Sequence, residues 1–192
     1  MKLLVAGLVV FLGVHSVRIF ADDWRNARIA TLGERKWKLA YTAVSIVGLV
    51  LVVYGYAQAR QVTPLLYDPP LWSRHAAAAL VLIAFVLIAA AYVKGTRIKA
   101  RVGHPMVLGV KVWAVAHLLA NGTLADVVLF GAFLAWAVLD YIASRRRDRA
   151  SGVVYPVGPW SRDAIAIAAG VVAWWVFAFI LHGPLIGVRP LP

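Results

Sequence analysis

Six long runs of apolar side chains alternate with short polar or Pro- and Gly-containing segments along the whole chain. A helix that crosses about 30 Å of hydrocarbon needs roughly 20 mainly apolar residues. The pattern therefore predicts an all-α fold, a polytopic transmembrane bundle of six helices forming a single domain over residues 1–192. The expected helices are residues 2–20, 37–59, 72–93, 105–119, 123–143 and 164–186.

The fourth expected helix is shorter than the others. Its 15 residues span only about 22 Å at a rise of about 1.5 Å per residue, less than the hydrocarbon thickness. We expect the long side chain of Lys111 to extend toward the headgroups on one side. The Asn121-Gly122 turn at the other end would then lie within the membrane, shielded by neighbouring helices.

The basic residues gather on one side of the predicted bundle. Of the 20 Lys and Arg residues in this chain of net charge +12, 16 flank the turns of one side and only four the other. The positive-inside rule therefore predicts a multi-pass protein of the bacterial inner (cytoplasmic) membrane with both termini periplasmic. Topology and anionic headgroups account for the charge, so the expected partner is the lipid bilayer and no nucleic acid.

The residue types present limit the chemistry. The chain contains no cysteine, which excludes disulfides, thiolate metal ligands and cysteine nucleophiles. It also shows no Ser-His-Asp grouping, no Gly-rich phosphate loop and no paired acids, so neither a hydrolase nor a kinase site is predicted. Because ionisable groups inside a bilayer are costly, histidines within the expected helices become the main functional candidates.

His15 lies within the first expected helix, on a face that also carries Leu8, Phe11 and Ile19. This position predicts that the imidazole points into the bundle. The structural alternative is a neutral ring bonded to a backbone carbonyl or to Ser45 of the next helix.

His117 lies in the short fourth helix, with Trp113 and Asn121 four residues away on either side and on the same face. An aromatic wall, an imidazole and an amide could hold a planar ligand, with Asn121 either fixing the ring or capping the turn. The structural alternative is a histidine at a helix end that satisfies the turn.

Depth suggests that the two histidines meet. If Arg18 and Lys111 both reach the inner headgroups, His15 lies about 4–5 Å deeper than Arg18 and His117 about 9 Å deeper than Lys111. Two imidazoles at similar depth on facing helices can ligate one metal, and haem is the usual occupant of such a pair in a bundle. Zinc and di-iron are less favoured without cysteines or a carboxylate cluster.

The other three histidines are expected to have boundary or secondary roles. His104 precedes Pro105 at the start of the fourth helix, where proline is favoured and the preceding residue is kept out of helical geometry. His75 and His182 lie near the outer surface, at the ends of the third and sixth expected helices.

Several motifs together resemble the NnrU family of membrane proteins, which is associated with denitrification and related to plant 15-cis-zeta-carotene isomerases. The longest is the central segment that begins His-Pro-Met-Val-Leu-Gly and continues through Ala-His-Leu-Leu-Ala-Asn-Gly. The resemblance covers nearly the whole chain, through the segments at residues 14–16, 32–35, 67–70, 104–109, 112–122 and 181–184.

In the isomerase relatives, haem b is held by histidines in contexts that read here as Val-His-Ser and Ala-His-Leu. The resemblance therefore implies His15 and His117 as axial ligands, with Arg18 or Lys111 as a partner of the haem propionates. Two departures are visible, because this chain has Ala114 where the isomerase has a cysteine and Gly103 where it has an arginine. The resemblance thus supports haem binding better than carotene isomerisation.

The leading expectation is a haem b protein with a redox or electron-transfer role linked to nitrite and nitric oxide metabolism, or an isomerase-like activity on a small hydrophobic substrate. One alternative is a membrane S-adenosylmethionine-dependent methyltransferase of the isoprenylcysteine methyltransferase type, which the His104-Pro105 motif also resembles. That group has a downstream pair of glutamates, whereas the only glutamate here is Glu34. A non-catalytic assembly partner of a respiratory complex is the third alternative.

Overall fold

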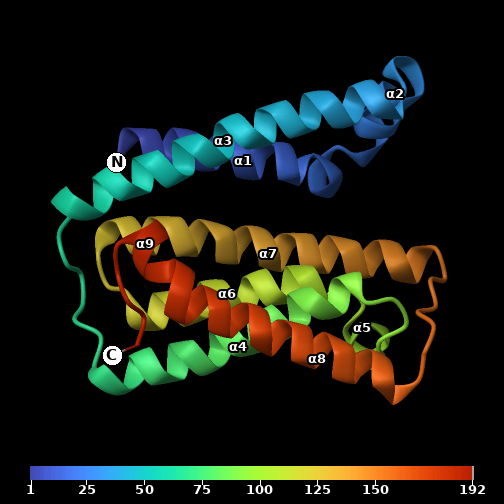
Figure 1. The fold of residues 1–192 in the computed structure, drawn as a ribbon. Coiled ribbons are helices and arrows are strands. Elements are labelled where there is room, and N and C mark those ends of the chain that lie inside the picture. The colour runs from blue at the N-terminus through green and yellow to red at the C-terminus, as the bar shows by residue number, and fades with distance from the viewer. Residues whose placement is uncertain (192) are drawn as a thin grey trace.

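A computed structural model describes residues 1–191, and within that range it contains helices and no strand beyond one isolated bridge between Leu65 and Thr123. Figure 1 shows long helices packed side by side, with both chain ends at the same end of the molecule. The helices are α1 (Lys2–Phe20), α2 (Asp22–Leu32), α3 (Glu34–Val62), α4 (Leu71–Tyr92), α5 (Arg97–Val102), α6 (Pro105–Ala120), α7 (Leu124–Ala150), α8 (Trp160–Trp175), the π-helix η1 (Val176–Leu181) and α9 (His182–Ile186).

Every expected transmembrane segment is helical except for its end residues Val93 and Thr123, but a count of six spans is not confirmed. Within the described residues, five helices are long and apolar enough to cross a membrane, the last being the continuous run Trp160–Ile186. Helix α6, which corresponds to the fourth expected helix, is apolar but too short to be counted among these spans, in agreement with the short helix predicted from the sequence. The protein is therefore a membrane-type helical protein with at least these five long apolar helices.

The structure also contains helices that the hydrophobic pattern does not predict. Residues 22–32 lie between two expected helices and were assigned to neither, yet they form α2, which follows a non-helical Ala21 (φ −142°) and is capped by Gly33 (φ +82°). Asp22 and Asp23 in its first turn favour a helix start because they face the positive end of the helix dipole. A polar helix at the membrane surface lacks the long apolar run on which the prediction depended.

The last expected helix is continuous but changes its hydrogen-bonding pattern along its length. Residues 164–186 were predicted as one helix, whereas the chain passes from α8 through η1 into α9. Pro184 has no N–H to donate to the preceding turn, and Gly183 adds backbone freedom beside it. The wider π turn accommodates this local loss of regular helical hydrogen bonding.

The long helices form a curved row in the order α3, α1, α7, α6, α4 and α8 (Figure 1). Helix α7 joins the α1–α3 hairpin to the remaining helices, because it packs against both α1 and α6. Among the described residues, α1 and α6 make no close backbone contact with each other. Any site shared by α1 and α6 must therefore be organised across α7.

Glycines allow α1 and α3 to approach closely. A Cβ built on Gly48 would lie 2.7 Å from the backbone nitrogen of Phe11, and one on Gly7 would lie 2.5 Å from that of Val52. Small residues at helix contacts are the usual means of association inside a membrane, where van der Waals packing replaces the hydrophobic effect. The core cluster lies beside this contact, among α1, α3 and α7.

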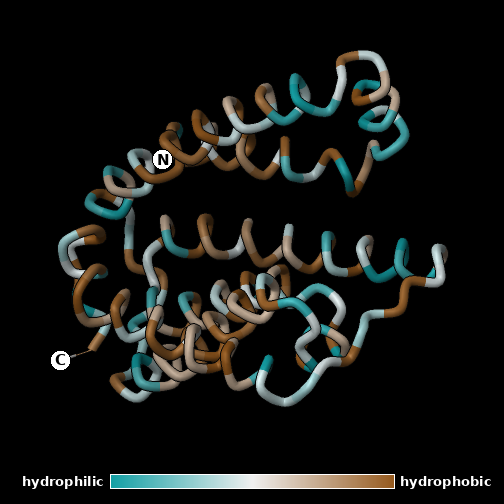
Figure 2. The backbone as a smooth tube through the Cα atoms, turned by 45° about the vertical axis from the view of Figure 1, so that its right-hand side comes forward, coloured by the Kyte–Doolittle hydropathy of each residue, from teal (hydrophilic) through white to brown (hydrophobic). Residues whose placement is uncertain are grey.

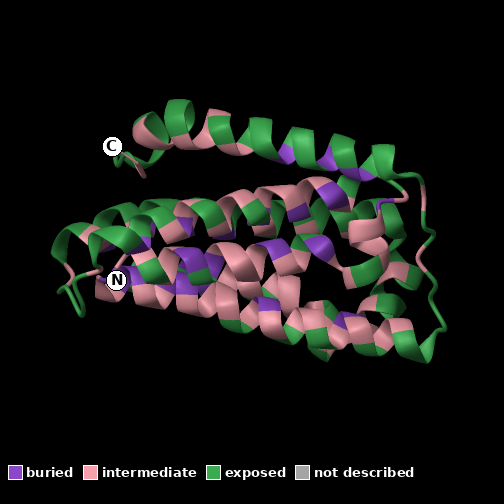
Figure 3. Ribbon diagram, turned by 90° about the horizontal axis from the view of Figure 1, so that it is seen from below, coloured by how far each residue is buried: buried purple, intermediate pink, exposed green. Residues whose placement is uncertain are grey.

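The two ends of the bundle along the helix axes differ in polarity. Brown, hydrophobic segments occupy the middle of the helices in Figure 2, and teal segments gather around α2 and the end of α7. We call this the basic end, because it carries Arg18, Arg97 and Arg147, and we call the other the terminal end, because both chain termini lie there. Green, exposed segments run along α8 in Figure 3, as expected for an apolar helix that faces lipid rather than water.

Candidate functional site

His117 lies in an aromatic setting near the terminal end of α6. Its ring stacks on Phe130 of α7, with centroids 4.6 Å apart, and lies 5.0 Å from the ring of Trp113. The Nδ1 atom is 2.9 Å from the carbonyl oxygen of Trp113, one helical turn earlier. The spacing of four residues therefore brings Trp113, His117 and Asn121 together as predicted.

Two roles were considered for Asn121, fixing the His117 ring or capping the turn, and the structure shows the capping role. Its side-chain amide donates to the carbonyl oxygen of His117 at 2.9 Å, and its backbone N–H donates to the same oxygen. The Tyr67 hydroxyl donates to the carbonyl oxygens of Asn121, at 2.6 Å, and of Leu118. This turn is closely enclosed, because a Cβ on Gly122 would overlap the carbonyl oxygen of Tyr67.

A buried acidic group beside this turn was not predicted as part of a site. Asp126 is only 5% exposed and accepts a 2.6 Å hydrogen bond from the Tyr56 hydroxyl. It also accepts from the backbone and hydroxyl of Thr123, completing a capping box at the start of α7. The Thr-x-x-Asp spacing could have revealed the cap, but the pairing with Tyr56 joins residues 70 positions apart.

His15 is half-buried near the basic end of α1. Its Nδ1 atom lies 2.6 Å from the carbonyl oxygen of Phe11, and its ring is surrounded by Phe11, Tyr41 and Trp136 at centroid distances of 4.2, 5.2 and 6.1 Å. Of the two bonds considered as a structural alternative for His15, the one to a backbone carbonyl is therefore present, whereas the Ser45 hydroxyl donates to the carbonyl oxygen of Tyr41 in its own helix. The indole N–H of Trp136 is buried without a hydrogen-bond partner among the described residues.

The structure does not bring the two imidazoles into contact. Phe11, beside His15, lies 5.9 Å from Phe133 of α7 by ring centroids, and Phe133 lies 5.6 Å from Trp113, beside His117. Three aromatic rings thus form a continuous path between the histidines. We refer to Phe11, Phe133 and Trp113 as the aromatic bridge.

The similar depth expected for the two histidines is not observed. His117 stacks on Phe130, whereas His15 faces Trp136, six positions further along α7. At a rise of about 1.5 Å per residue, their ring neighbours are separated by about 9 Å along the helix. The histidines therefore occupy different levels of the bundle.

The depth was estimated on the assumption that the side chains of Arg18 and Lys111 both reach the headgroups. The Lys111 ammonium instead lies over the ring of Tyr141 of α7, 5.5 Å from its centroid. Because this contact is made within the protein, the Lys111 side chain gives no measure of the distance to the headgroups.

His104 has more partners than a boundary residue requires. It precedes α6 as predicted, but its Nε2 lies 2.9 Å from Asp148, which also accepts a 2.9 Å hydrogen bond from Tyr155. Arg145 approaches the same carboxylate at 3.4 Å. Burial, followed by the hydrogen bond to Asp148, raises the pKa of Tyr155 to about 12, so the phenol remains a donor at neutral pH. Asp148 was not predicted as a partner of His104, because it lies within an arginine-rich segment of the sequence.

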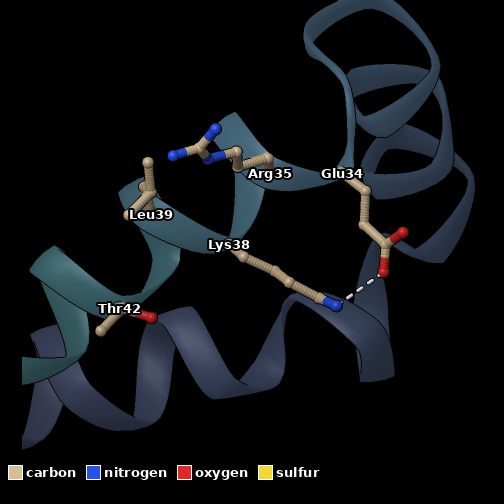
Figure 4. Close-up of a pocket in the computed structure, with 5 residues that line it drawn as sticks. All are labelled: Glu34, Arg35, Lys38, Leu39 and Thr42. Carbon is tan, nitrogen blue, oxygen red and sulfur yellow. Dashed lines mark ion pairs between the residues drawn. The ribbon is translucent and has the colours of Figure 1, made fainter.

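The remaining candidates lie apart from these sites. His75 is exposed, and His182 bonds the carbonyl oxygen of Val188 at 2.6 Å. Figure 4 shows Glu34 at the mouth of an open pocket of about 370 Å³ at the start of α3, with its carboxylate directed to Lys38 at 2.7 Å. This carboxylate is already engaged in an exposed ion pair.

Comparison with known proteins adds one finding. The family model described as "NnrU protein" matches residues 3–190, which is nearly the entire chain. No curated protein and no solved structure matches the chain.

Proposed function

Because this chain belongs to the NnrU family, we propose that it is a haem b protein with a redox or electron-transfer role in nitrite and nitric oxide metabolism. His15 and His117 are the proposed axial ligands, and the haem, when bound, supplies one-electron redox chemistry. We place the protein in the bacterial inner membrane with both termini in the periplasm, where it exchanges electrons with a redox partner. If both imidazoles held the iron, the haem would supply electron transfer rather than catalysis on a hydrophobic substrate.

The orientation of the two imidazoles is the observation that supports this proposal best. In both, Nδ1 is bonded to the carbonyl oxygen four residues earlier, and Nε2 has no hydrogen-bond partner among the described residues. A metal-ligating histidine usually donates its other ring N–H to a carbonyl or carboxylate, which fixes the tautomer and the ring orientation. Each histidine is therefore prepared to bind a metal through Nε2.

The surroundings also suit a flat, apolar cofactor. The aromatic bridge and Phe130 provide ring faces between the two histidines. The unpartnered indole N–H of Trp136 offers a buried donor beside His15. Both residue types fit a ligand that combines a large π face with a few polar groups.

Binding of one iron by both histidines requires the aromatic bridge to move aside. Helices α1 and α6 each pack on α7 and make no close backbone contact with each other within the described residues. The rings of Phe11 in α1 and Trp113 in α6 can therefore turn without breaking a direct backbone contact between these two helices. Lys111 remains the proposed partner of a propionate, whereas Arg18 is directed to a separate cavity at the basic end.

No observation favours the methyltransferase alternative, because Glu34 is exposed and paired with Lys38. The experiment that tests the proposal is haem reconstitution of the detergent-purified protein, followed by absorbance spectra in the oxidised and dithionite-reduced states. We expect a Soret band and about one haem per chain for the wild type, with reduced retention for His15→Ala and His117→Ala. The matched control is His75→Ala, which removes an exposed imidazole.

Absence of a Soret band from the reconstituted wild type would overturn haem binding. Wild-type spectra and haem retention in both His15→Ala and His117→Ala would overturn the ligand assignment. Loss of retention in His117→Ala alone would show that His15 is not a ligand.

A further inference from the structure

A second cavity of about 370 Å³ lies at the basic end, where the end of α1 meets the end of α7. It is separate from the aromatic surroundings of both proposed haem ligands. Its lining combines cationic, acidic and hydroxyl side chains rather than a single charge type. The lining residues are Arg18, Asp22, His104, Ser144, Arg147, Asp148, Ala150, Ser151 and Val153.

Local backbone geometry creates this cavity. The chain turns sharply at Ala21 (φ −142°) between α1 and α2, which places Asp22 one turn beyond Arg18. Arg147 then connects α7 to this corner by donating to the carbonyl oxygen of Arg18 at 3.0 Å and to the hydroxyl of Ser144 at 2.7 Å. The cavity is therefore held open between two fixed helix ends.

One wall of the cavity has its hydrogen bonds already satisfied. Asp148 accepts from Tyr155, contacts the His104 ring and lies near Arg145. Its side chain is only 13% exposed. The Asp148 carboxylate already has hydrogen-bond donors around it, so it needs no further donor from a ligand.

The part of the cavity formed by Arg18 and Asp22 has hydrogen-bonding groups that are not fully paired. Within the described residues, the Oδ1 atom of Asp22 is buried and has no hydrogen-bond partner, although the side chain as a whole is 33% exposed. Its nearest cations, on Arg25 and Arg18, lie 3.6 and 4.0 Å away, which is within ion-pair range but too long for hydrogen bonds. The Arg18 side chain is 60% exposed, and Asp22 is its only ion-pair partner among the described residues. The cavity thus places a carboxylate and a guanidinium side by side that make only long ion pairs.

We propose that this cavity binds the headgroup of an aminophospholipid, with its ammonium group at Asp22 and its phosphate at Arg18 and Arg147. A primary ammonium has three donors, and arginine binds phosphate through paired N–H groups. A purely anionic headgroup satisfies the arginines but is repelled by Asp22. A choline headgroup carries positive charge but no N–H to donate. A phosphoethanolamine-type headgroup meets both demands.

The position of the cavity agrees with this ligand. Helix α1 is mainly apolar up to Val17, and Arg18 in its last turn and Asp22 just beyond it lie at the level where a spanning helix meets the headgroups. Basic residues gather at this end of the molecule, as in proteins that bind phospholipid headgroups. This inference does not depend on haem binding.

The test compares lipid retention by the full-length protein in detergent, measured by native mass spectrometry. Phosphatidylethanolamine, phosphatidylglycerol and phosphatidylcholine with identical acyl chains are supplied at equal concentration. We expect about tenfold preference for phosphatidylethanolamine over phosphatidylcholine, the effect of about one charge-assisted hydrogen bond. Asp22→Asn should abolish that preference, and Arg18→Gln should lower retention of phosphatidylethanolamine and phosphatidylglycerol alike.

Lys36→Gln is the matched control, because it removes an exposed positive charge at the same end without touching the cavity. Soluble phosphoethanolamine in excess should displace the lipid if the headgroup is what is recognised. Equal retention of the three lipids by the wild type, an unchanged preference in Asp22→Asn, or no displacement by phosphoethanolamine would each overturn the proposal. Thermal unfolding of each variant distinguishes loss of binding from loss of fold.

Discussion

His15 and His117 make the same local hydrogen bond but lie in different surroundings. Each ring is tied through Nδ1 to the carbonyl oxygen four residues earlier. His117 is enclosed by a stacked Phe130, by Trp113 and by a capped turn, whereas His15 lies between two helices whose close approach depends on glycines. The local bond sets the orientation of a ring, and packing determines how firmly that orientation is kept.

This contrast predicts that the His117 side is the rigid half of the site and the His15 side the adaptable half. Ligation of a common iron would then require α1 and its side chains to adjust more than α6. The following substitutions test that division, beginning with the largest expected effect.

Phe130→Ala should destabilise the protein most. Phe130 is 4% exposed and touches the rings of His117, Trp113 and Tyr56, and loss of such a buried ring costs about 3–5 kcal/mol. Phe11→Ala, at a half-buried ring beside His15, should cost clearly less. Equilibrium unfolding in mixed detergent measures both. Equal costs would remove the distinction between a rigid and an adaptable side.

Gly48→Val should disturb the His15 side selectively. The new side chain would meet the backbone of Phe11, the residue that holds the His15 ring, and such overpacking costs about 1–3 kcal/mol. Gly13→Val is the control, because a Cβ at Gly13 meets no atom within 4 Å. The imidazole NMR signals of His15 should shift in Gly48→Val while those of His117 stay in place. A comparable shift at His117 would contradict the division.

Tyr67→Phe should have the smallest effect, about 1 kcal/mol, because it removes one hydroxyl that bonds the carbonyls at the end of α6. The exposed Tyr92 provides the control, Tyr92→Phe. Burial raises the pKa of Tyr67, so its contribution is complete below the unfolded value near 10 and is lost as pH rises through the folded value. Stability that falls equally in Tyr67→Phe and wild type above pH 10 would contradict this assignment.

Hydrophobic periodicity predicted the helices well because apolar length is a local property. The bounds of α1 were predicted to the residue, and α6 was recognised as short. Helix α2 was missed because a polar surface helix has no apolar run, and α7 extends to Ala150 because its arginine-rich end continues the helix beyond the membrane-spanning part.

The candidate site around the two histidines could be predicted only for residues that lie close together in the sequence. The grouping of Trp113, His117 and Asn121 follows from helical spacing, and the structure confirms that these residues lie together. The relative depth of His15 and His117 depends on how α1 and α6 pack against α7, and the long side chains of Arg18 and Lys111 gave a poor measure of it. The pairs Tyr56–Asp126 and His104–Asp148 join distant segments and have no local pattern.

Electron paramagnetic resonance of the ferric, haem-loaded protein tests the central claim most directly, because it reports how many strong axial ligands the iron has. We predict a low-spin signal typical of two axial imidazoles in the wild type. Either His15→Ala or His117→Ala should convert it to a high-spin signal, whereas His75→Ala should leave it unchanged. A high-spin wild type, or a low-spin signal that survives both substitutions, would contradict ligation by this pair.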